Sequence, residues 1–171
     1  MISQSHGRLA LAAFSVLALQ ARASAQGAAI VRPSQIADSS HPLSIQPALA
    51  GFRIGQGISD ALARLGKPLK VDTLGSGPDS PVSYANLATG ITVVGTTAAG
   101  VGVILATSRD AGTLDSVRVG DSRASVLKRW GPPAAGSAEG GLWLDGDYVV
   151  AVSFDDGARV KRLVIGVGLT L

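Results

Sequence analysis

The sequence has 171 residues, of which 46% are hydrophobic and 16% charged, and it contains 22 Gly, a single Glu and no Cys. This composition excludes a solvated disordered chain, which would be poor in apolar residues and rich in like charge. The absence of Cys excludes a disulfide scaffold, a thiolate nucleophile and a Cys-ligated zinc site.

The N-terminus has the pattern of a secretory signal peptide. A short basic start is followed by the apolar run Leu9–Leu19 and by the small-residue triplet Ala23-Ser24-Ala25. Eleven helical residues rise only about 16 Å, which is less than the hydrocarbon core of about 30 Å. We therefore expect residues 1–25 to be removed and the mature chain to be periplasmic or extracellular. The alternative is a retained segment that anchors the domain to the inner membrane.

Cleavage changes the charge of the working protein. Loss of Arg8 and Arg22 leaves 13 basic against 12 acidic residues, so the formal charge falls from +3 to +1. A nearly neutral chain gives little support to binding of nucleic acid or of anionic lipid. We expect neither a nucleic-acid partner nor stable membrane insertion after cleavage.

Residues 26–50 mix Pro, Ser and small residues without a sustained period, and they are interpreted as a flexible leader. The leader contains His41, the only histidine of the mature chain. A Ser-His-Asp triad therefore has no suitable histidine in the compact part, which we expect to begin near Gly51.

An internal similarity follows the leader. Phe52–Pro68 aligns without a gap on Val117–Pro133, with six identities in 17 positions: Arg53/Arg118, Gly55/Gly120, Leu62/Leu127, Arg64/Arg129, Gly66/Gly131 and Pro68/Pro133. The spacing predicts a short amphipathic helix in each segment that ends at Gly66 or Gly131. We therefore divide the compact part into a first repeat, residues 51–116, and a second, residues 117–171.

Three strands are predicted after each helix. They cover residues 82–87, 91–97 and 101–107 in the first repeat, and residues 142–144, 148–154 and 159–167 in the second. The predicted fold class is α+β: two tandem repeats of a short helix followed by a three-stranded antiparallel sheet, with the helices packed on one sheet face.

The glycine and proline pattern of these segments resembles the domain of the small outer-membrane assembly lipoproteins of the SmpA/OmlA type. In tandem it also resembles the secreted β-lactamase inhibitor proteins. The resemblance covers residues 52–167 and implies a binding or scaffold module, in the inhibitors one with a concave sheet that grips a partner enzyme. The lipid-bearing Cys of the lipoproteins and the Cys pairs of the inhibitors are both absent.

Two groups of residues suggest ligand chemistry. Gly55-Gln56-Gly57 resembles the first half of a dinucleotide fingerprint, but Asp60 occupies the place of the third Gly, and a helix-capping turn is the simpler interpretation. Four carboxylates lie in predicted turns of the second repeat: Asp145, Asp147, Asp155 and Asp156. They suggest either a hydrolase or ordinary turn chemistry, and no metal or cofactor is expected.

Basic residues concentrate in the second repeat, at Arg118, Arg123, Lys128, Arg129, Arg159, Lys161 and Arg162. Aspartates offset them in the same segment, so a solvated face is favoured over a nucleic-acid surface.

The few aromatic residues are the remaining candidates for binding. Tyr84 and Trp143 fall at similar places in the first strand predicted for each repeat, and Tyr148 opens the next strand. Large aromatic side chains dominate interface energies, although ordinary core packing is the more common role of such residues. We predict a secreted, non-enzymatic protein-binding or envelope scaffold module with these three partner-binding candidates and no catalytic residue. The alternative is a secreted hydrolase that uses the turn carboxylates.

Overall fold

The computed structural model describes residues 48–167. Two short strands open this part of the chain, β1 (Ala48–Leu49) and β2 (Phe52–Arg53), and they pair with each other. Leu49 is fully buried in the core. The end of the predicted leader is therefore part of the fold, whereas residues 1–47, with the predicted signal peptide and His41, lie outside the described residues.

Helix α2 (Ile58–Leu65) and helix α3 (Arg123–Trp130) form where the periodicity predicts them. In α3, the Ser122 hydroxyl caps the N-terminus by accepting a hydrogen bond from the Ser125 amide at 3.2 Å. Gly66 and Gly131 end the two helices with φ values of 75° and 73°, a backbone conformation that favours glycine. A single 3-10 turn, Arg109–Ala111, lies between the helices in the chain.

Four strands follow each helix. After α2 come β3 (Lys70–Thr73), β4 (Val82–Asn86), β5 (Ile91–Thr96) and β6 (Gly100–Ala106). After α3 come β7 (Ala135–Gly136), β8 (Gly140–Asp145), β9 (Tyr148–Phe154) and β10 (Val160–Val167).

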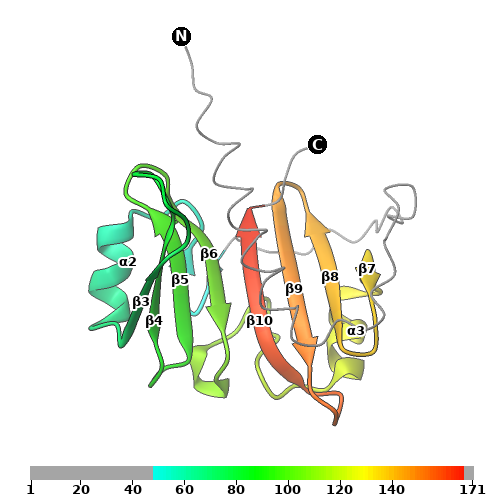
Figure 1. Ribbon diagram of the computed structural model, residues 1–171. Helices are drawn as coiled ribbons and strands as arrows, with labels where there is room; N and C mark the ends of the chain where they lie inside the picture. Colours follow the sequence, from blue (N-terminus) through cyan, green and yellow to red (C-terminus); the bar gives the residue numbers. More distant parts are fainter. Residues whose placement is uncertain (1–47, 168–171) are drawn as a thin grey trace.

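All eight strands belong to one antiparallel sheet in the order β3-β4-β5-β6-β10-β9-β8-β7 (Figure 1). The two groups of four meet at the middle, where β6 pairs with β10 in the register Leu163 with Ala106 through Gly166 with Val103. The outermost strands are therefore β3 and β7, the first strand of each group.

The predicted fold class is wrong. The described chain is mostly β, with one eight-stranded sheet, one two-stranded sheet and two α-helices, and it does not form two repeats that each hold a helix and a three-stranded sheet. Six strands lie within two residues of their predicted ranges, but β3 and β7 are missing from the prediction. All four residues of β3 are exposed and β7 has only two small residues, so neither strand has the apolar alternation that marks a half-buried strand.

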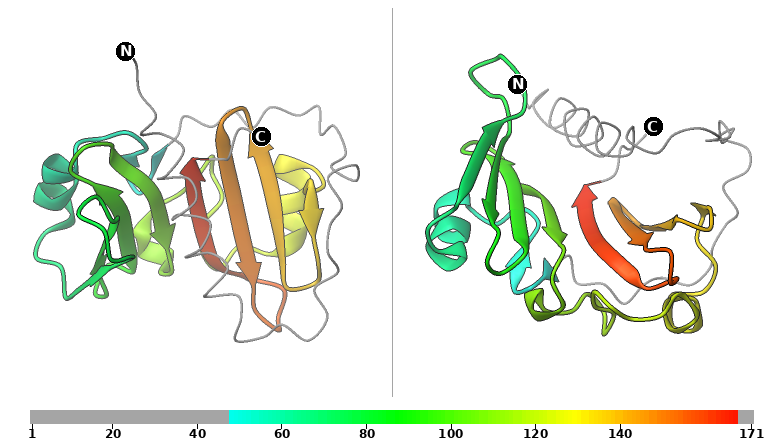
Figure 2. Two further views of the ribbon diagram at one scale, coloured as in Figure 1. Left: turned by 45° about the horizontal axis from the view of Figure 1, so that its top comes forward. Right: turned by 60° about the horizontal axis from the view of Figure 1, so that its bottom comes forward.

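Both helices pack on the same side of the sheet. Ile58, Leu65, Val126 and Trp130 of the helices join one core cluster with sheet residues such as Ile104. Figure 2 shows the helices on the outer side of the bend in the sheet. We call the opposite side, to which neither helix contributes, the helix-free face.

Candidate partner-binding surface

The three aromatic candidates lie on the helix side of the sheet. Tyr84 pairs across the sheet with Val93, and Trp143 pairs with Val150. Val93 and Val150 both belong to the core cluster that the helices cover, and cross-strand partners share a face. Tyr148 lies two residues before Val150 and so points to the same side.

Trp143 is a core residue in this structure, with 2% of its surface exposed. Its ring meets the Trp130 ring edge to face, with centroids 5.4 Å apart at 73°. Its indole N–H donates to the Gly131 carbonyl oxygen at 3.2 Å. Trp143 therefore joins β8 to the end of α3, and the free protein presents almost none of its surface to a partner.

Tyr84 and Tyr148 are half-buried and lie on different strands, β4 and β9. Tyr84 pairs with Val71, which is 53% exposed, and Tyr148 pairs with Val167, which is 38% exposed. Because β4 and β9 are separated in the sheet by β5, β6 and β10, the structure does not bring the three aromatic candidates together into one surface.

The centre of the helix-free face is aliphatic, a feature that is absent from the sequence-based predictions. Val94, Val103 and Val164 form a second apolar cluster there, and Leu74, Leu105 and Ala151 pack against it. One cross-strand row on this face spans all eight strands of the sheet: Lys70, Ala85, Thr92, Leu105, Val164, Ala151, Leu142 and Ala135. An antiparallel sheet with one side in water alternates apolar and polar residues. The centre of this face departs from that pattern, because Val94, Val103 and Val164 are apolar and each is only 6% exposed.

A signal for this face is present in the sequence. The strands at the middle of the sheet contain continuous apolar runs, which cover all of β6 (GVGVILA) and the last five residues of β10 (LVIGV). A continuous apolar run is typical of a strand that is covered on both sides.

The turn carboxylates lie in two separate groups. Asp145 and Asp147 flank the turn before β9, and Asp155 and Asp156 follow the other end of this strand. Seven strand residues span about 23 Å, so the two groups do not converge. Asp155 also has a structural role, because its Oδ1 accepts a hydrogen bond from the Arg159 amide at 2.8 Å.

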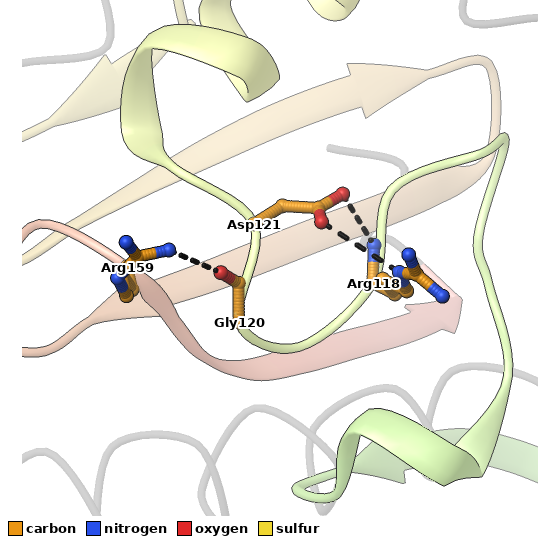
Figure 3. A network of polar contacts seen from close by, with 4 residues as sticks. All are labelled: Arg118, Gly120, Asp121 and Arg159. Atoms are coloured by element: carbon orange, nitrogen blue, oxygen red, sulfur yellow. Dashed lines mark hydrogen bonds and ion pairs between the residues drawn. The ribbon is translucent and has the colours of Figure 1, made fainter.

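Three basic residues of the second half make contacts in or beside the loop that precedes α3 (Figure 3). Asp121 accepts a hydrogen bond from the Arg118 amide at 3.2 Å, and its carboxylate lies 3.8 Å from Arg118 Nε. Arg159 donates to the Gly120 carbonyl oxygen at 3.1 Å. Arg123 lies over the Phe154 ring, 5.7 Å from its centroid. These contacts favour a structural role for Arg118, Arg123 and Arg159.

The partial dinucleotide motif, Gly55-Gln56-Gly57, forms backbone hydrogen bonds within the fold. The Gly55 amide donates to the Val101 carbonyl oxygen at 2.7 Å, so it does not face a phosphate. Among residues 48–167, no group of three or more His, Cys, Asp or Glu side chains is placed to hold a metal ion. No helix in that range is long and apolar enough to cross a membrane.

Comparison with solved structures places the fold among bacterial proteins of low sequence similarity. A cysteine-rich secretory protein from Staphylococcus aureus matches with a TM-score of 0.54 and 13% identity over 72% of this chain and 48% of that one. An extracellular protein containing an SCP domain from Bacillus anthracis matches with a TM-score of 0.52 and 13% identity over 84% of this chain and 50% of that one. A DUF4309 family protein from Bacillus subtilis matches with a TM-score of 0.45 and 12% identity over 68% and 82% of the two chains.

The chain thus spans about half the length of the first two proteins. At this level of identity the likeness concerns the fold alone. No family model and no curated protein matches the sequence. Fold and surface together define a mostly β protein in which an eight-stranded curved sheet has helices on one side and, on the other, a face with an aliphatic centre.

Proposed function

We propose that this protein is exported and acts without catalysis, by binding a protein partner with the helix-free face of its sheet. The observation that carries the proposal is the aliphatic composition of this face. Val94, Val103 and Val164 form its centre, and no described helix contributes to that cluster. Binding to an apolar surface of another protein would remove the remaining exposed apolar area from water, which is the main favourable term in association.

Three further observations support the proposal. The sequence resembles the secreted β-lactamase inhibitor proteins, in which a sheet binds a partner. The two solved structures with the higher TM-scores are described as a secretory protein and an extracellular protein. The pattern of residues 1–25 is that of a signal peptide. The turn carboxylates offer less support for a hydrolase, because the length of β9 separates the two groups.

Export is tested by sequencing the N-terminus of protein released from expressing cells by osmotic shock or recovered from the medium. We expect the mature chain to begin at Gln26. Protein that stays with the membrane fraction and still begins near Met1 would contradict export as a free protein and support a retained anchor.

Binding is tested with a photo-crosslinking amino acid in place of Leu105, which is half-buried at the centre of the helix-free face. The matched control carries the same amino acid in place of Ala63, an exposed residue of α2. We expect an adduct with one second protein from Leu105 and none from Ala63. The purified partner should then bind the Leu105→Glu variant at least about tenfold more weakly than the Ala63→Glu variant.

Adducts that form only within the chain, between Leu105 and residues 26–47, would contradict the proposal. The helix-free face would then be covered by the protein's own N-terminal segment. Equal binding of the partner by the Leu105→Glu and Ala63→Glu variants would also contradict it.

A further inference from the structure

The two edge strands of the sheet, β3 and β7, differ in how readily they could pair with a strand of another chain. The β7 edge has only Ala135 and Gly136, preceded by Pro132 and Pro133. The β3 edge is longer, and all of its residues are exposed. A proline precedes each edge strand at the aligned positions Pro68 and Pro133, and β3 also carries two charged residues, so the two edges differ chiefly in length: β3 offers four residues for pairing with another chain and β7 offers two.

Exposed apolar side chains gather at the β3 edge. Among the described residues, four large hydrophobic side chains are exposed, and two of them are Val71 in β3 and Leu69 directly before it, at 53% and 63%. A third, Leu87 at 67%, follows β4 at the end where β3 begins. An unpaired strand with such side chains is a template for strand addition.

The backbone of β3 leaves hydrogen-bonding groups free for such an addition. The Leu74 amide donates to the Pro81 carbonyl oxygen at 2.8 Å, which fixes the alternation of hydrogen bonds between β3 and β4. Within β3 the residues an even number of positions from Leu74 therefore bond to β4, and the N–H and C=O groups of Val71 and Thr73 point to the open edge. Directly before β3 this alternation ends, because the Leu69 amide also donates to β4, to the Ala85 carbonyl oxygen at 2.9 Å.

The charges of β3 are complementary to those of a second copy of the same strand. Lys70 and Asp72 point to the helix-free side and form an ion pair of 2.9 Å. If two copies of β3 pair antiparallel about a twofold axis at Val71, then Lys70 of each copy lies opposite Asp72 of the other. Opposite charges in directly paired positions are stabilising, whereas a parallel pairing in register would place like charges side by side.

We propose that the β3 edge is a homodimer interface, in which two copies pair antiparallel with Val71 on the twofold axis. Val71 then exchanges both backbone hydrogen bonds with Val71 of the other copy, and Leu69 of each copy lies opposite Thr73 of the other. The two sheets become one continuous sheet. Because a four-residue strand buries less area than a standard interface of about 1,600 Å², the dimer is reversible and its population depends on concentration.

The first experiment exchanges the two charges. Sedimentation velocity of the purified protein over a range of concentrations should show a monomer–dimer equilibrium. Lys70→Asp alone and Asp72→Lys alone each place like charges opposite each other, and we expect dimerisation at least about tenfold weaker. The double variant with both substitutions restores opposite charges and should restore the dimer. Lys128→Asp, on the exposed side of α3, makes the same charge change far from β3 and should leave the equilibrium unchanged.

The second experiment tests the register and uses the absence of Cys from the sequence. In the proposed pairing the Cα atoms of the two Val71 residues lie about 5.5 Å apart, a separation that a disulfide spans. A Val71→Cys variant should therefore form a covalent dimer on mild oxidation. A Thr73→Cys variant should not, because the two copies of residue 73 are separated by about 13 Å along the strand direction.

Three results would overturn the proposal. One is a protein that stays monomeric up to about 1 mM. Another is a dimer that both single charge reversals leave intact, which would place the interface elsewhere. The third is equal disulfide formation by the Val71→Cys and Thr73→Cys variants, which would show random collision in place of the proposed register. None of these results bears on binding by the helix-free face, because that test uses Leu105.

Discussion

The loop before each helix is fastened to the sheet by the same backbone contacts in both halves of the molecule. In the first half, the Gly55 amide donates to the Val101 carbonyl oxygen at 2.7 Å, and the Val101 amide donates to the Gln56 carbonyl oxygen at 2.8 Å. In the second half, the Gly120 amide donates to the Val160 carbonyl oxygen at 2.7 Å, and the Val160 amide donates to the backbone carbonyl oxygen of Asp121 at 2.8 Å.

The side chains around these contacts differ. In the second half, Asp121 and the arginines at positions 118 and 159 add charged contacts to the loop. In the first half, the residue before Val101 is Gly100, and a Cβ there would overlap the Gln56 carbonyl oxygen. The same backbone geometry is thus accompanied by charged side-chain contacts in the second half, whereas in the first half it requires a glycine at position 100 and has the neutral Gln56 side chain in place of Asp121.

The largest expected difference between the halves is in packing. Trp143 and Tyr84 lie in the same cross-strand row, on opposite sides of the β6–β10 pair at the middle of the sheet. Trp143 is buried, whereas Tyr84 is half-buried. We expect Trp143→Ala to lower the free energy of unfolding by about 3 to 5 kcal/mol, because it leaves a cavity beside Trp130. Tyr84→Ala should lower it by about 1 to 2 kcal/mol. Urea unfolding followed by circular dichroism measures both, and equal losses would contradict the packing difference.

The contrast between these two residues also shows what the sequence could predict. Local signals were sufficient for both helices, since apolar spacing and the terminal glycines define them. The six longer strands were found for a similar reason, because β-branched residues and turn residues mark them. Trp130 falls on the apolar face of its helix, and this position is enough to indicate the core residue that the structure shows.

The pairing of the strands into one sheet could not be predicted from such local signals. Nothing in the sequence of β6 or β10 states that they pair with each other, because that pairing joins residues about 60 positions apart. The exposed strand β3 carries no apolar alternation to identify it. The orientation of Trp143 depends on register, which decides the face of the sheet on which each side chain lies. The aliphatic face was not predicted for the same reason, because its Val and Leu residues are indistinguishable from core residues until the register is known.

The second expected effect concerns Gly100. It has a φ of 73°, and an added Cβ would also approach the backbone of Gln56. We expect Gly100→Ala to lower the free energy of unfolding by about 2 to 4 kcal/mol, from backbone strain and steric overlap together. Gly146→Ala is the matched control, because Gly146 has a φ of 55° but no atom within 4 Å of the place that a Cβ would occupy. Strain alone should lower the stability of that variant by about 1 kcal/mol. Similar losses in the two variants would show that the contact with Gln56 is unimportant.

The smallest expected effect compares the side chains that support the two loops. Gln56 accepts a hydrogen bond from the Arg53 amide at 3.1 Å, and Asp121 accepts the corresponding bond from the Arg118 amide at 3.2 Å. We expect Asp121→Ala to lower the free energy of unfolding by about 1 kcal/mol in dilute buffer, and Gln56→Ala by about 0.5 kcal/mol. Only the Asp121 contacts include an ion pair.

Salt separates the two contributions to this smallest effect. At 1 M NaCl the Debye length falls to about 3 Å, so the ion-pair contribution of Asp121 is largely screened while the neutral hydrogen bond of Gln56 is not. The loss caused by Asp121→Ala, measured against the unmodified protein by urea unfolding at each salt concentration, should therefore shrink toward that of Gln56→Ala. A loss that stays the same at both salt concentrations would mean that Asp121 acts through its hydrogen bond alone. The two loops would then be fastened by equivalent contacts, and the charges around the second loop would add nothing to its stability.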